Sequence, residues 1–478
     1  MPVGREGAGP LGETRRGVLP VYVASHIALP VQGLPAGLLR AVTSELTLDN
    51  PEYLRAVKYG RSTWDMQPKI ELFQVKGGWL ILPRGYGPRL KKLLGAHRII
   101  PRWVDRRLRL PPVEFTSRIL LRDYQVPAVE ALVKGIQGGV VAGCGAGKTV
   151  ILLEALARIK QPALWICHTH ELLEQTRERA REALGLGPRD LGTVASGEAR
   201  LGKKLTLALI QTLHRLDLDG LARHFGMVFV DEAHHLAART FFATVGRFPA
   251  KYRLWASATP RRDDGLTKMV FACGGPILYT VGPAEPPRVV PRLVVVTTRF
   301  ASLEDHYPRL ISSLVEDPER NRLIAETIAR EGPGNYSLVL SERVEHLERL
   351  QRLLAELAPG LRAEILTGKL GKRARKAVMQ RVRAKEVDVL LATQLAREGL
   401  DIVHLNRLFL ATPKRSGSAL QQEVGRIMRP GAGKRDAVVF DFWDVGSPVL
   451  KAQFWPRREV YRKLGIYFSR DCVRSGGV

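Results

Sequence analysis

One stretch of the chain restricts the fold more than any other, because an apolar segment, a glycine-rich turn and an apolar helical segment follow one another directly. Residues 139–142 predict a short buried strand, and residues 150–159 predict a helix. The turn between them reads GCGAGKT at residues 143–149. A turn of this kind directs backbone N–H groups and the positive end of a helix at one point, which predicts an anion site.

The turn nearly matches the phosphate-binding P-loop pattern of Gly, four residues and then Gly-Lys-Ser/Thr. Ala142 stands where the pattern has its first glycine. Lys148 is predicted to reach the terminal phosphates, and the Thr149 hydroxyl to ligate Mg²⁺. A chance glycine-rich turn is the alternative, and the flanking strand and helix argue against it. The residues predicted to contact a nucleotide are Gly145, Ala146, Gly147, Lys148 and Thr149.

The charge of the chain is strongly one-sided. Lys and Arg number 74 against 47 Asp and Glu, which gives a net charge of +27 over 478 residues. Such an excess predicts a polyanionic partner, and nucleic acid is the natural one. The alternative is a solubilising surface, or ion pairs rich in arginine as in thermophiles. The length suffices for about three domains.

The cysteines and the N-terminal region suggest a cytosolic protein. Cys144, Cys167, Cys273 and Cys472 lie far apart and form no Cys-x-x-Cys pair, so neither a zinc site nor a disulfide framework is expected. A reducing cytoplasm is the predicted setting. The apolar run at residues 18–29 is interrupted by proline and histidine, so we expect a buried strand there rather than a signal peptide or a membrane span.

Two proline-rich stretches, at residues 110–112 and 283–291, predict domain boundaries. Beyond the first stretch, short apolar runs alternate with longer amphipathic ones, which predicts an α/β fold with parallel sheets covered by helices. Residues 227–230 and 387–391 are expected to be buried strands. Leucines at helical spacing predict a helix from Val344 that ends before Gly360. The predicted domains are 1–112, 116–284 and 292–478.

The N-terminal domain is expected to be a small α/β unit that binds DNA. It is predicted to contain a strand at 21–28, a helix at 36–45 and a hairpin that pairs 70–75 with 79–82. A basic run follows, opposed only by Asp105, and predicts a surface that follows phosphates; a solvated face is the alternative. The run consists of Arg84, Arg89, Lys91, Lys92, Arg98, Arg102, Arg106, Arg107 and Arg109.

Two carboxylates at the end of a predicted buried strand suit phosphate hydrolysis. Asp231 is predicted to hold the Mg²⁺ and its water shell, and Glu232 to orient and deprotonate the attacking water. His234 and His235 follow them, but they lack the His-Glu-x-x-His spacing of zinc enzymes, so we do not expect zinc.

A pair of arginines lies far downstream in the segment QEVGRIMR at residues 422–429. Arg426 and Arg429 are three residues apart, so on a helix both would lie on one face. Such pairs are often surface ion-pair partners. In a chain with a P-loop they become candidate arginine fingers, which stabilise charge during phosphoryl transfer.

With these motifs, the chain resembles the superfamily-2 helicases and translocases over residues from about 118 to 445. The family form of the first motif begins with Ala or Gly, so Ala142 is a permitted residue. The resemblance implies two RecA-like domains face to face, with ATP in the cleft between them. The matching segments, in the family's order, are LRDYQ at 121–125, AGCGAGKT at 142–149, THEL at 169–172, IQTL at 210–213, DEAH at 231–234, SATP at 257–260, LVLS at 338–341, ATQ at 392–394, EGLD at 398–401 and QEVGRIMR at 422–429.

The resemblance also implies roles for single residues. Those implied to contact the nucleotide are Arg122 and Gln125, on the base, together with Gly399 and Asp401. Those implied to act in hydrolysis are Lys148, Glu232, Gln422, Arg426 and Arg429. Those implied to couple hydrolysis to movement of nucleic acid are His234, Ser257 and Thr259. Those implied to contact nucleic acid are Thr169, Gln175, Thr212 and Thr393.

Two shorter segments indicate the branch of this superfamily that the chain resembles. SATPRRDDG at 257–265 resembles the DNA-acting branch, and residues 58–86 are similar to the N-terminal domain of the UvsW-like branched-DNA helicases. The predicted function is therefore an ATP- and Mg²⁺-dependent DNA helicase or translocase for duplex or branched DNA in recombination, repair or fork rescue. RNA–DNA hybrids remain a further possible substrate. The alternatives are an RNA helicase, the motor of a restriction or defence system, and a structural DNA-binding protein with a degenerate ATPase.

Overall fold

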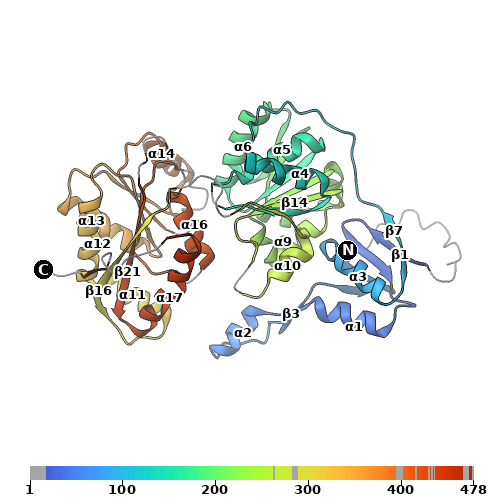
Figure 1. The fold of residues 1–478 in the computed structure, drawn as a ribbon, viewed down its shortest axis with the longest axis horizontal. Coiled ribbons are helices and arrows are strands. Elements are labelled where there is room, and N and C mark those ends of the chain that lie inside the picture. Colours follow the sequence, from blue (N-terminus) through green and yellow to red (C-terminus); the bar gives the residue numbers. More distant parts are fainter. Residues whose placement is uncertain are drawn as a thin grey trace. The chain divides into compact units, whose positions relative to one another are not determined.

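The computed structural model describes residues 18–143, 145–261, 264–282, 289–393, 402–414, 417–428, 431, 434, 436–466 and 473–475 (Figure 1). The chain divides into two compact units. Apart from the short turn at residues 143–147, residues up to Val281 form the first unit and residues from Gly282 form the second.

The first unit begins with a mixed sheet. Among the described residues this sheet has five strands, in the spatial order β5 (Gln74–Lys76), β6 (Trp79–Pro83), β2 (His26–Pro30), β1 (Val18–Val23) and β7 (Ile100–Asp105). Strands β1 and β7 are parallel, and the other neighbours are antiparallel. A separate ribbon pairs β3 (Thr47–Asp49) with β4 (Lys69–Glu71). The helices are α1 (Ala36–Glu45), α2 (Pro51–Lys58), η1 (Arg84–Tyr86) and α3 (Gly87–Ala96).

The sequence predicted parts of this region correctly. The helix at 36–45 is α1, and the pairing of β5 with β6 confirms the end of the hairpin across Gly77 and Gly78, which both have a left-handed backbone. The first part of its predicted strand is wrong, because residues 69–71 form β4 and pair with β3. The strand expected at 21–28 is instead two antiparallel strands, β1 and β2. The error has a local cause, since only Ser25 and His26 interrupt the apolar run, and the turn between the strands contains neither glycine nor proline.

A larger sheet forms the centre of the first unit. Within the described part of the chain it has eight strands, in the order β11 (Glu198–Arg200), β10 (Leu191–Ala195), β12 (Leu205–Leu209), β9 (Ala163–Cys167), β13 (Met227–Asp231), β14 (Tyr252–Ser257), β8 (Gln137–Val141) and β15 (Ile277–Thr280). All neighbouring strands are parallel except β10 and β11. Strands β9, β10, β12 and β13 are buried throughout, as expected of parallel strands covered on both faces.

Helices connect these strands. In chain order they are η2 (Asp123–Gln125), α4 (Val126–Lys134), α5 (Lys148–Ile159), α6 (His170–Leu184), α7 (Ile210–Arg215), α8 (Leu218–Leu221), η3 (Ala222–His224), η4 (Ala233–Ala237), α9 (Arg239–Gly246) and α10 (Thr267–Gly274). The strand and helix predicted on either side of the glycine-rich turn are β8 and α5, and the strand predicted at 227–230 is β13. The alternation of strands and helices is therefore confirmed.

The small sheet and the large sheet share one hydrophobic core. Side chains from both, such as Leu90 and Leu94 on α3 and Phe248 and Ala250 before β14, belong to one buried cluster. The contact is close, because a Cβ added at Gly85 would lie 2.1 Å from the carbonyl oxygen of Phe271 on α10. The N-terminal sheet is therefore fixed to the large sheet rather than tethered to it.

Two buried arginines strengthen this contact. Arg84 is 3% exposed, and its guanidinium donates to Gln137 Oε1 at 2.6 Å and to the carbonyl oxygen of Ala250 at 2.7 Å. Arg253 donates to the carbonyl oxygens of Ser25 and Phe248. Burial, and then the charge of the other arginine, lowers the pKa of Arg84. The prediction that Arg84 contacts nucleic acid is wrong, because its donors are used inside the protein.

The second unit is built on a parallel sheet. In the described ranges it has seven strands, in the order β18 (Ala363–Leu366), β19 (Val389–Thr393), β17 (Ser337–Ser341), β20 (Arg407–Leu410), β21 (Val438–Gly446), β16 (Arg292–Ala301) and β22 (Val473–Ser475). Its described helices are α11 (Tyr307–Glu316), α12 (Pro318–Glu331), α13 (Val344–Leu357), α14 (Lys372–Arg383), α16 (Gly417–Ile427) and α17 (Pro448–Lys463).

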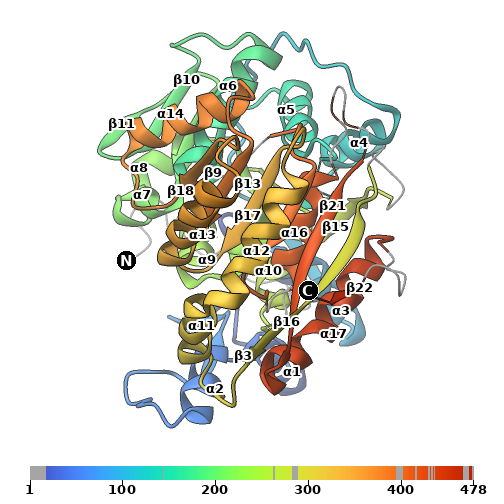
Figure 2. The same cartoon turned by 90° about the vertical axis from the view of Figure 1, so that its left-hand side faces the viewer.

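Both faces of this sheet are buried, and alternate residues of one strand serve the two cores. In β17, Leu338 and Leu340 pack with α16 and α17, whereas Val339 packs with α12 and α13. Figure 2 shows α12 and α13 in front of the sheet. The leucines at helical spacing from Val344 are mostly core, since Leu347, Leu350 and Leu354 are buried on α13, whereas Leu357 at its end is 37% exposed. A continuous apolar run that is buried on both faces is typical of a parallel strand.

Two smaller findings bear on the cellular setting. Among the helices of the described residues, none combines the length and the apolar composition that crossing a bilayer requires. Cys167 and Cys273 are buried free thiols, while Cys144 and Cys472 lie outside the described residues. The predicted cytoplasmic location stays a prediction.

Candidate nucleotide site

The predicted chemistry gathers at one edge of the eight-stranded sheet. Strands β13, β14 and β8 are neighbours and run in the same direction, so their carboxyl ends meet at a single edge. The glycine-rich turn follows β8, Asp231 ends β13, and Ser257 ends β14 between them. Ligands of open parallel sheets bind outside the carboxyl ends of the strands. The fold therefore brings together segments that are up to about a hundred residues apart in the sequence.

The glycine-rich turn has the backbone that a phosphate cradle needs. Gly145 has φ 82° and Gly147 has φ 77°, a left-handed conformation that glycine adopts without steric cost. Ala142 is buried, and its N–H donates to the carbonyl oxygen of Ser257 at 3.0 Å. Ala142 can therefore replace the first glycine of the P-loop pattern, because this position packs at the end of β8 rather than in the turn itself. Helix α5 begins at Lys148, so the positive end of its dipole faces the turn.

Lys148 and Glu232 face each other across this edge. Lys148 Nζ lies 3.5 Å from Glu232 Oε1, and both side chains are largely shielded from solvent. Glu232 has φ 55° and ψ 62°, a left-handed backbone at a residue that is not glycine. Such strain costs on the order of 1 kcal/mol or more and is concentrated at functional sites. Here the strained turn ends β13 and directs the Glu232 carboxylate toward the P-loop lysine.

The two neighbouring carboxyl groups have different proton affinities. Burial and then the adjacent charge of Glu232 raise the pKa of Asp231 to about 6. At Glu232, burial acts to raise the pKa, but Lys148 and His234 together outweigh it and hold the pKa well below its usual value. Glu232 is therefore a carboxylate at neutral pH, as a group that orients and deprotonates water must be.

The oxygen atoms near this edge fit a magnesium ion. Asp231 supplies a carboxylate and Thr149, in the first turn of α5, supplies a hydroxyl, and these hard oxygen ligands are the type that Mg²⁺ takes in proteins. No group of three or more His, Cys, Asp or Glu side chains with metal-binding geometry occurs in the part of the chain that the structure describes. Mg²⁺ commonly keeps several waters and binds through one or two protein ligands plus phosphate oxygens, so this small ligand set is sufficient.

A short chain of polar groups leads from Glu232 to β14. His234 Nδ1 lies 3.4 Å from Glu232 Oε2 and 3.5 Å from Ser257 Oγ. Ser257 Oγ in turn accepts a hydrogen bond from the N–H of Thr259 at 3.2 Å. The three residues predicted to couple hydrolysis to movement therefore lie in one contact path from the catalytic carboxylate. Their coupling role stays a prediction.

Sequence reasoning missed a stack of imidazole rings beside this path. The ring of His235 lies 4.0 Å from that of His168 and 4.2 Å from that of His234, measured between centroids. His168 follows β9 and precedes Thr169, so the stack joins the end of β9 to the segment after β13. The available signal was a His-Thr-His segment at the end of an apolar strand, directly before a helix.

Three of the residues predicted to contact nucleic acid also lie at this carboxyl edge. Thr169 caps α6, accepting from the N–H of Leu172 at 3.3 Å, and Gln175 lies on the same helix. Thr212 is in α7, directly after β12. The two segments are tied together, because Gln211 Nε2 donates to the carbonyl oxygen of His168 at 3.0 Å. Helix starts and hydroxyl groups in this arrangement suit phosphate contacts.

The residues predicted to recognise the base form a compact turn before α4. Gln125 is buried, its Oε1 accepts from the N–H of Arg122 at 3.0 Å, and Arg122 Nη1 donates to the hydroxyl of Tyr124. The turn fixes the orientation of both side chains. Contact with adenine stays a prediction.

The second unit holds the remaining predicted residues. Thr393 ends β19 next to β17, and Gln422 and Arg426 lie on α16. The same helix is anchored by a buried ion pair, with Lys414 Nζ 3.5 Å from Glu423 Oε1. Arg429, Gly399 and Asp401 lie outside the described residues, so their predicted roles stay predictions.

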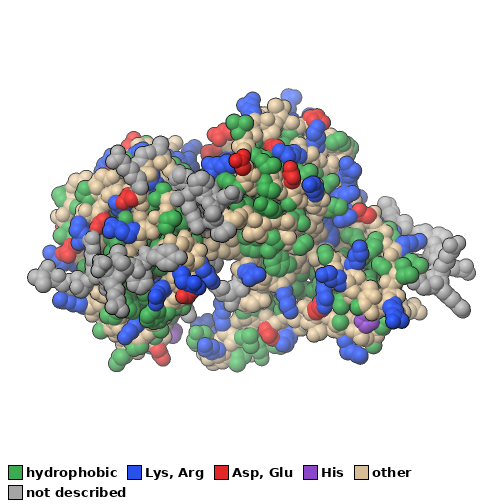
Figure 3. Space-filling view, in the orientation of Figure 1, with side chains coloured by type: hydrophobic (Ala, Val, Ile, Leu, Met, Phe, Trp, Pro, Cys, Tyr) green, Lys and Arg blue, Asp and Glu red, His purple; other side chains and the backbone are tan. Residues whose placement is uncertain are grey.

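The N-terminal basic run is less uniform than its sequence indicates. Arg89 donates to Glu45, at 3.1 Å between Nε and Oε1, whereas Lys91 and Lys92 are exposed on α3. Arg106 stacks over the ring of Tyr22 and Arg107 pairs with Asp105. Lys and Arg side chains are spread widely over the face drawn in Figure 3. The predicted phosphate-binding surface is therefore limited to those Lys and Arg side chains of the run that are exposed and do not pair with a carboxylate.

Comparison with known families gives two matches in order along the chain. The family model of the res subunit of type III restriction enzymes matches residues 118–262, and that of the helicase conserved C-terminal domain matches residues 319–431. The first match spans the P-loop and the Asp231–Glu232 pair, and the second spans Thr393, Gln422 and Arg426.

Curated relatives are helicases and a translocase. A protein of Acanthamoeba polyphaga mimivirus, whose name proposes an ATP-dependent RNA helicase, is 27% identical over 372 residues, covering 74% of this chain and 70% of the relative. The DNA 3'-5' translocase XPB2 of Sulfurisphaera tokodaii is 24% identical over 363 residues, covering 67% and 81%. The DNA 3'-5' helicase XPB of Kineococcus radiotolerans is 27% identical over 340 residues, covering 65% and 57%.

Solved structures establish the fold. Dbp5 of Saccharomyces cerevisiae, solved with RNA and ADP BeF3, matches with a TM-score of 0.55 at 15% identity, covering 81% of this chain and 93% of that chain. The restriction-modification enzyme LlaBIII, solved with DNA, matches with a TM-score of 0.55 at 15% identity, covering 76% and 32%. Phage T4 UvsW covers 96% and 99% at 16% identity, with a TM-score of 0.43. Because the two family models together match more than half of the chain, on a fold with two RecA-like parallel sheets, the chain belongs to the superfamily-2 helicases and is an ATP-dependent enzyme.

Proposed function

We propose that this helicase works on DNA, and that it unwinds or remodels duplex or branched DNA in recombination, repair or fork rescue. The relatives named as DNA 3'-5' helicases and translocases support DNA as the substrate. The N-terminal sheet, fixed to the first large sheet, supports a preference for branched DNA because it adds exposed cations next to the motor.

The observation that carries the proposal is the contact path from Lys148 through Glu232 and His234 to Ser257. Lys148 would hold the terminal phosphates, and Glu232 would orient a water and accept its proton. His234 would transmit the change at Glu232 to the end of β14. Arg426 and Arg429 would stabilise the negative charge that develops on the transferred phosphoryl group.

Magnesium is part of the proposal. Asp231 and Thr149 would hold Mg²⁺, which when bound neutralises charge on the outer phosphates. Gln125 and Arg122 would recognise the base, and Gly399 and Asp401 would contact the nucleotide from the second RecA-like domain. Removal of the metal with EDTA should abolish ATP hydrolysis, and added Mg²⁺ should restore it.

The experiment is an ATPase assay with forked DNA, blunt duplex, single strands and RNA duplex, on the wild type and on Lys148→Ala. We expect DNA to raise the wild-type rate at least tenfold and Lys148→Ala to remove both the basal and the stimulated rate. Lys134→Ala is the matched control, because Lys134 is an exposed lysine on α4, outside the site. A wild-type rate indifferent to every DNA would refute the proposal.

A second candidate function is the motor of a restriction system, which the match to the res subunit of type III restriction enzymes favours. Such a motor translocates along duplex DNA without separating strands. A strand-displacement assay beside a triplex-displacement assay distinguishes the two, because a pure translocase displaces only the triplex strand. Unwinding of RNA duplexes alone would instead favour an RNA helicase.

The domain division is also a proposal. We infer a DNA-binding domain at 1–112 and RecA-like domains at 116–284 and 292–478. The linker between the first two is tied to the first RecA-like domain, since Leu108 exchanges backbone hydrogen bonds with Pro249 and Lys251, and Val113 N–H donates to Lys160. A cytoplasmic location is proposed with them.

A further inference from the structure

One projection of the first unit takes no part in the chemistry described above. Residues 50–68 connect β3 to β4, contain helix α2, and extend outward from the β3–β4 ribbon (Figure 1). We call these residues the α2 excursion. Asn50 closes its base, because its N–H donates to the carbonyl oxygen of Pro68 at 3.0 Å and its Nδ2 donates to that of Gln67 at 2.7 Å. Asn50 Oδ1 also caps α2, so the excursion is a built element.

The α2 excursion exposes large apolar side chains that nothing in the fold requires. Trp64 is 89% exposed and Tyr59 is 60% exposed, and Leu54 and Val57 on α2 are exposed as well. Of the eight residues of α2, only Ala56 is buried. Single exposed apolar residues are ordinary, but four within eleven residues on one projection indicate a contact surface.

Two cations lie beside one of these aromatic rings, that of Tyr59. Lys58 Nζ and the guanidinium carbon of Arg61 each lie 6.0 Å from the centroid of the Tyr59 ring. Arg55 is exposed on the same helix, and within the described residues none of these three cations forms an ion pair with a carboxylate. Aromatic rings beside free cations are the combination that binds unpaired nucleotides, with rings stacking on bases and cations contacting phosphates.

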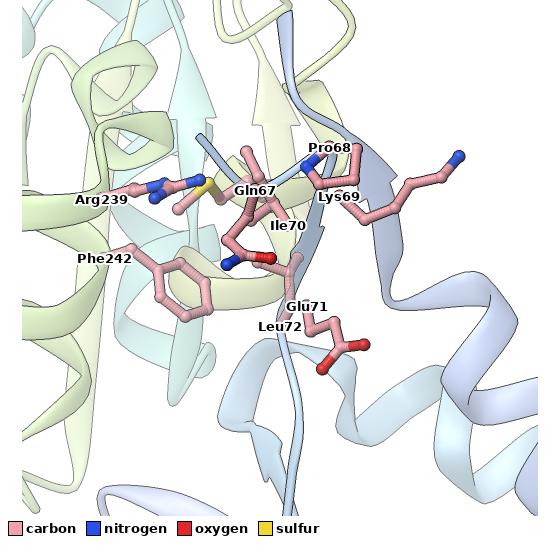
Figure 4. Close-up of a pocket in the computed structure, with 9 residues that line it drawn as sticks. Gln67, Pro68, Lys69, Ile70, Glu71, Leu72, Arg239 and Phe242 are labelled. Carbon is pink, nitrogen blue, oxygen red and sulfur yellow. The ribbon is translucent and has the colours of Figure 1, made fainter. Parts of the chain in front are cut away.

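A groove continues this surface at the base of the α2 excursion. Its volume is about 500 Å³, and it lies between the strand segment 67–72 and helices α9 and α10. Figure 4 shows Gln67, Arg239 and Phe242 directed toward the hollow, whereas Lys69 and Glu71 point away from it. An arginine, an amide and an aromatic ring therefore line the groove, which repeats the chemistry of the excursion.

We propose that the α2 excursion is a base-stacking element that binds unpaired nucleotides where single-stranded and double-stranded nucleic acid meet. Trp64 and Tyr59 stack on bases, Arg55, Lys58 and Arg61 contact phosphates, and the groove beside Arg239 receives the strand that continues. A duplex offers no free base faces along its length, so the rings select unpaired strands. The excursion carries three cations against the two exposed carboxylates Glu52 and Asp65, and the placement of two of these cations beside the Tyr59 ring favours a nucleic-acid strand over a protein surface. The inference rests on the proposed action on nucleic acid and names the part of the substrate that is recognised.

The test compares forked DNA, which has two unpaired arms, with a blunt duplex of the same length, using fluorescence anisotropy. Stacking of one base on an aromatic side chain is worth on the order of a tenfold change in affinity. We expect Trp64→Ala to weaken binding of the fork about tenfold and binding of the blunt duplex less than twofold, and Trp64→Phe to restore most of the loss. Forked DNA with 5-iodouracil in the arms should crosslink under ultraviolet light to peptides within residues 50–68.

Trp455→Ala is the matched control, because Trp455 is likewise an exposed tryptophan, on α17, and it lies beside the cation of Arg458. We expect it to leave the fork-to-duplex ratio unchanged, and an equal effect of Trp455→Ala would overturn the proposal. Equal losses on fork and duplex, or crosslinks only outside residues 50–68, would overturn it too. So would a Trp64→Ala protein with impaired ATPase in the absence of DNA, which would show that the excursion packs on protein.

The failure of this inference is distinguishable from failure of the proposed function. If forked DNA stimulates the wild-type ATPase but Trp64→Ala binds the fork normally, only the inference fails. If no nucleic acid stimulates the wild-type enzyme, the proposed function fails first.

Discussion

Glu232 shows how one residue can carry both strain and function. Its left-handed backbone is costly for a residue with a Cβ, yet this conformation places its carboxylate 3.5 Å from Lys148 Nζ and 3.4 Å from His234 Nδ1. The same contacts hold its pKa low, against the effect of burial. We interpret the strain as the cost of aiming a charged base at the P-loop.

The first prediction concerns Glu232→Gln. Gln has nearly the same shape but cannot accept the proton of the attacking water, so we expect kcat to fall by about 10²–10⁴-fold while ATP still binds. Steady-state ATPase and equilibrium nucleotide binding measure the two effects. Glu198→Gln, at an exposed carboxylate on β11, is the control and should leave both unchanged. A variant that keeps more than a tenth of the rate would remove Glu232 from the mechanism.

The second prediction concerns His346, a buried histidine in the second unit. Its Nε2 lies 2.8 Å from Asn321 Oδ1 and its Nδ1 lies 2.9 Å from Ser341 Oγ. Burial, and then the charges of Arg320 and Arg349, lower its pKa to about 3. Between pH 6.5 and 3 the unfolded chain therefore binds the proton and the folded chain does not. The free energy of unfolding should fall by up to about 1.4 kcal/mol for each pH unit below 6.5.

Hydrogen exchange of peptides that cover β17 and α13, measured between pH 5 and 7 and corrected for intrinsic rates, follows this change. His346→Gln should remove this part of the pH dependence, and His97→Gln, at an exposed histidine after α3, should leave it in place. An identical pH dependence in wild type and His346→Gln would contradict the assignment.

At the scale of elements, the contact between η1 and α10 decides how the N-terminal sheet is held. Gly85 allows two backbones to touch, and Arg84 beside it donates to carbonyl oxygens that a neutral side chain could not satisfy in the same way. Helix α10 follows the segment that contains Ser257 and Thr259. The N-terminal sheet is therefore attached to the part of the motor that is predicted to couple hydrolysis to movement.

The third prediction is that Gly85→Ala loosens this contact. The added Cβ would lie 2.1 Å from the Phe271 carbonyl oxygen, so backbone must shift, at a cost of about 1–3 kcal/mol. The thermal midpoint of the first unit should fall. Gly95→Ala on α3, where a Cβ meets nothing within 4 Å, is the matched control and should raise the stability by about 0.5–1 kcal/mol. Equal midpoints for the two variants would contradict the close contact.

A second element-scale feature joins β21 to α17. Arg457 donates to both oxygens of Asp441 at 2.9 Å, and the Tyr461 hydroxyl donates to Asp441 Oδ2 at 2.9 Å, all within the core of the second unit. Burial and then the charge of Asp441 raise the pKa of Tyr461, so the phenol remains a donor. The network fixes the helix on the sheet and needs all three groups.

The fourth prediction is that Arg457→Leu destabilises the second unit by about 3–5 kcal/mol, because it leaves a buried carboxylate without its cation. Arg458→Leu, at the exposed neighbour that stacks on Trp455, should cost less than about 1 kcal/mol. Denaturant unfolding followed by the fluorescence of Trp443 and Trp455 compares them. Similar costs for the two variants would show that the ion pair is not needed.

At the scale of the whole molecule, the net charge of +27 makes DNA binding depend on salt. If six phosphates are neutralised, affinity for a duplex should fall about 10³-fold between 50 and 200 mM salt. Titrations at four salt concentrations give the slope. Binding of ATP in the absence of DNA is the control and should change little. A slope that corresponds to fewer than two phosphates would show that the charge serves another purpose.

The structure also changes the design of experiments on the N-terminal region. Deletion of residues 1–112 would expose the core that this region shares with the large sheet, so loss of activity would report misfolding. Substitutions at exposed positions such as Trp64, Lys91 and Lys92 avoid this difficulty.

The sequence by itself determined the α/β class, the strand and helix around the P-loop, the leucine face of α13 and the family. These depend on local patterns, namely glycine at positions with positive φ, periodicity of apolar residues, and charged residues directly after buried strands. The same patterns indicated Lys148, Asp231 and Glu232, because motifs at strand ends keep their spacing in any fold of this class.

Tertiary structure alone decided which residues meet across the fold. The sequence of the basic run does not show that Arg84 is buried between two sheets whereas Lys91 and Lys92 are exposed to solvent. Burial of Arg84 depends on contacts with residues more than a hundred positions away. The imidazole stack, the His346 and Asp441 networks and the exposure of Trp64 have the same origin. Each depends on which side of an element faces its neighbours, and only long-range packing sets this.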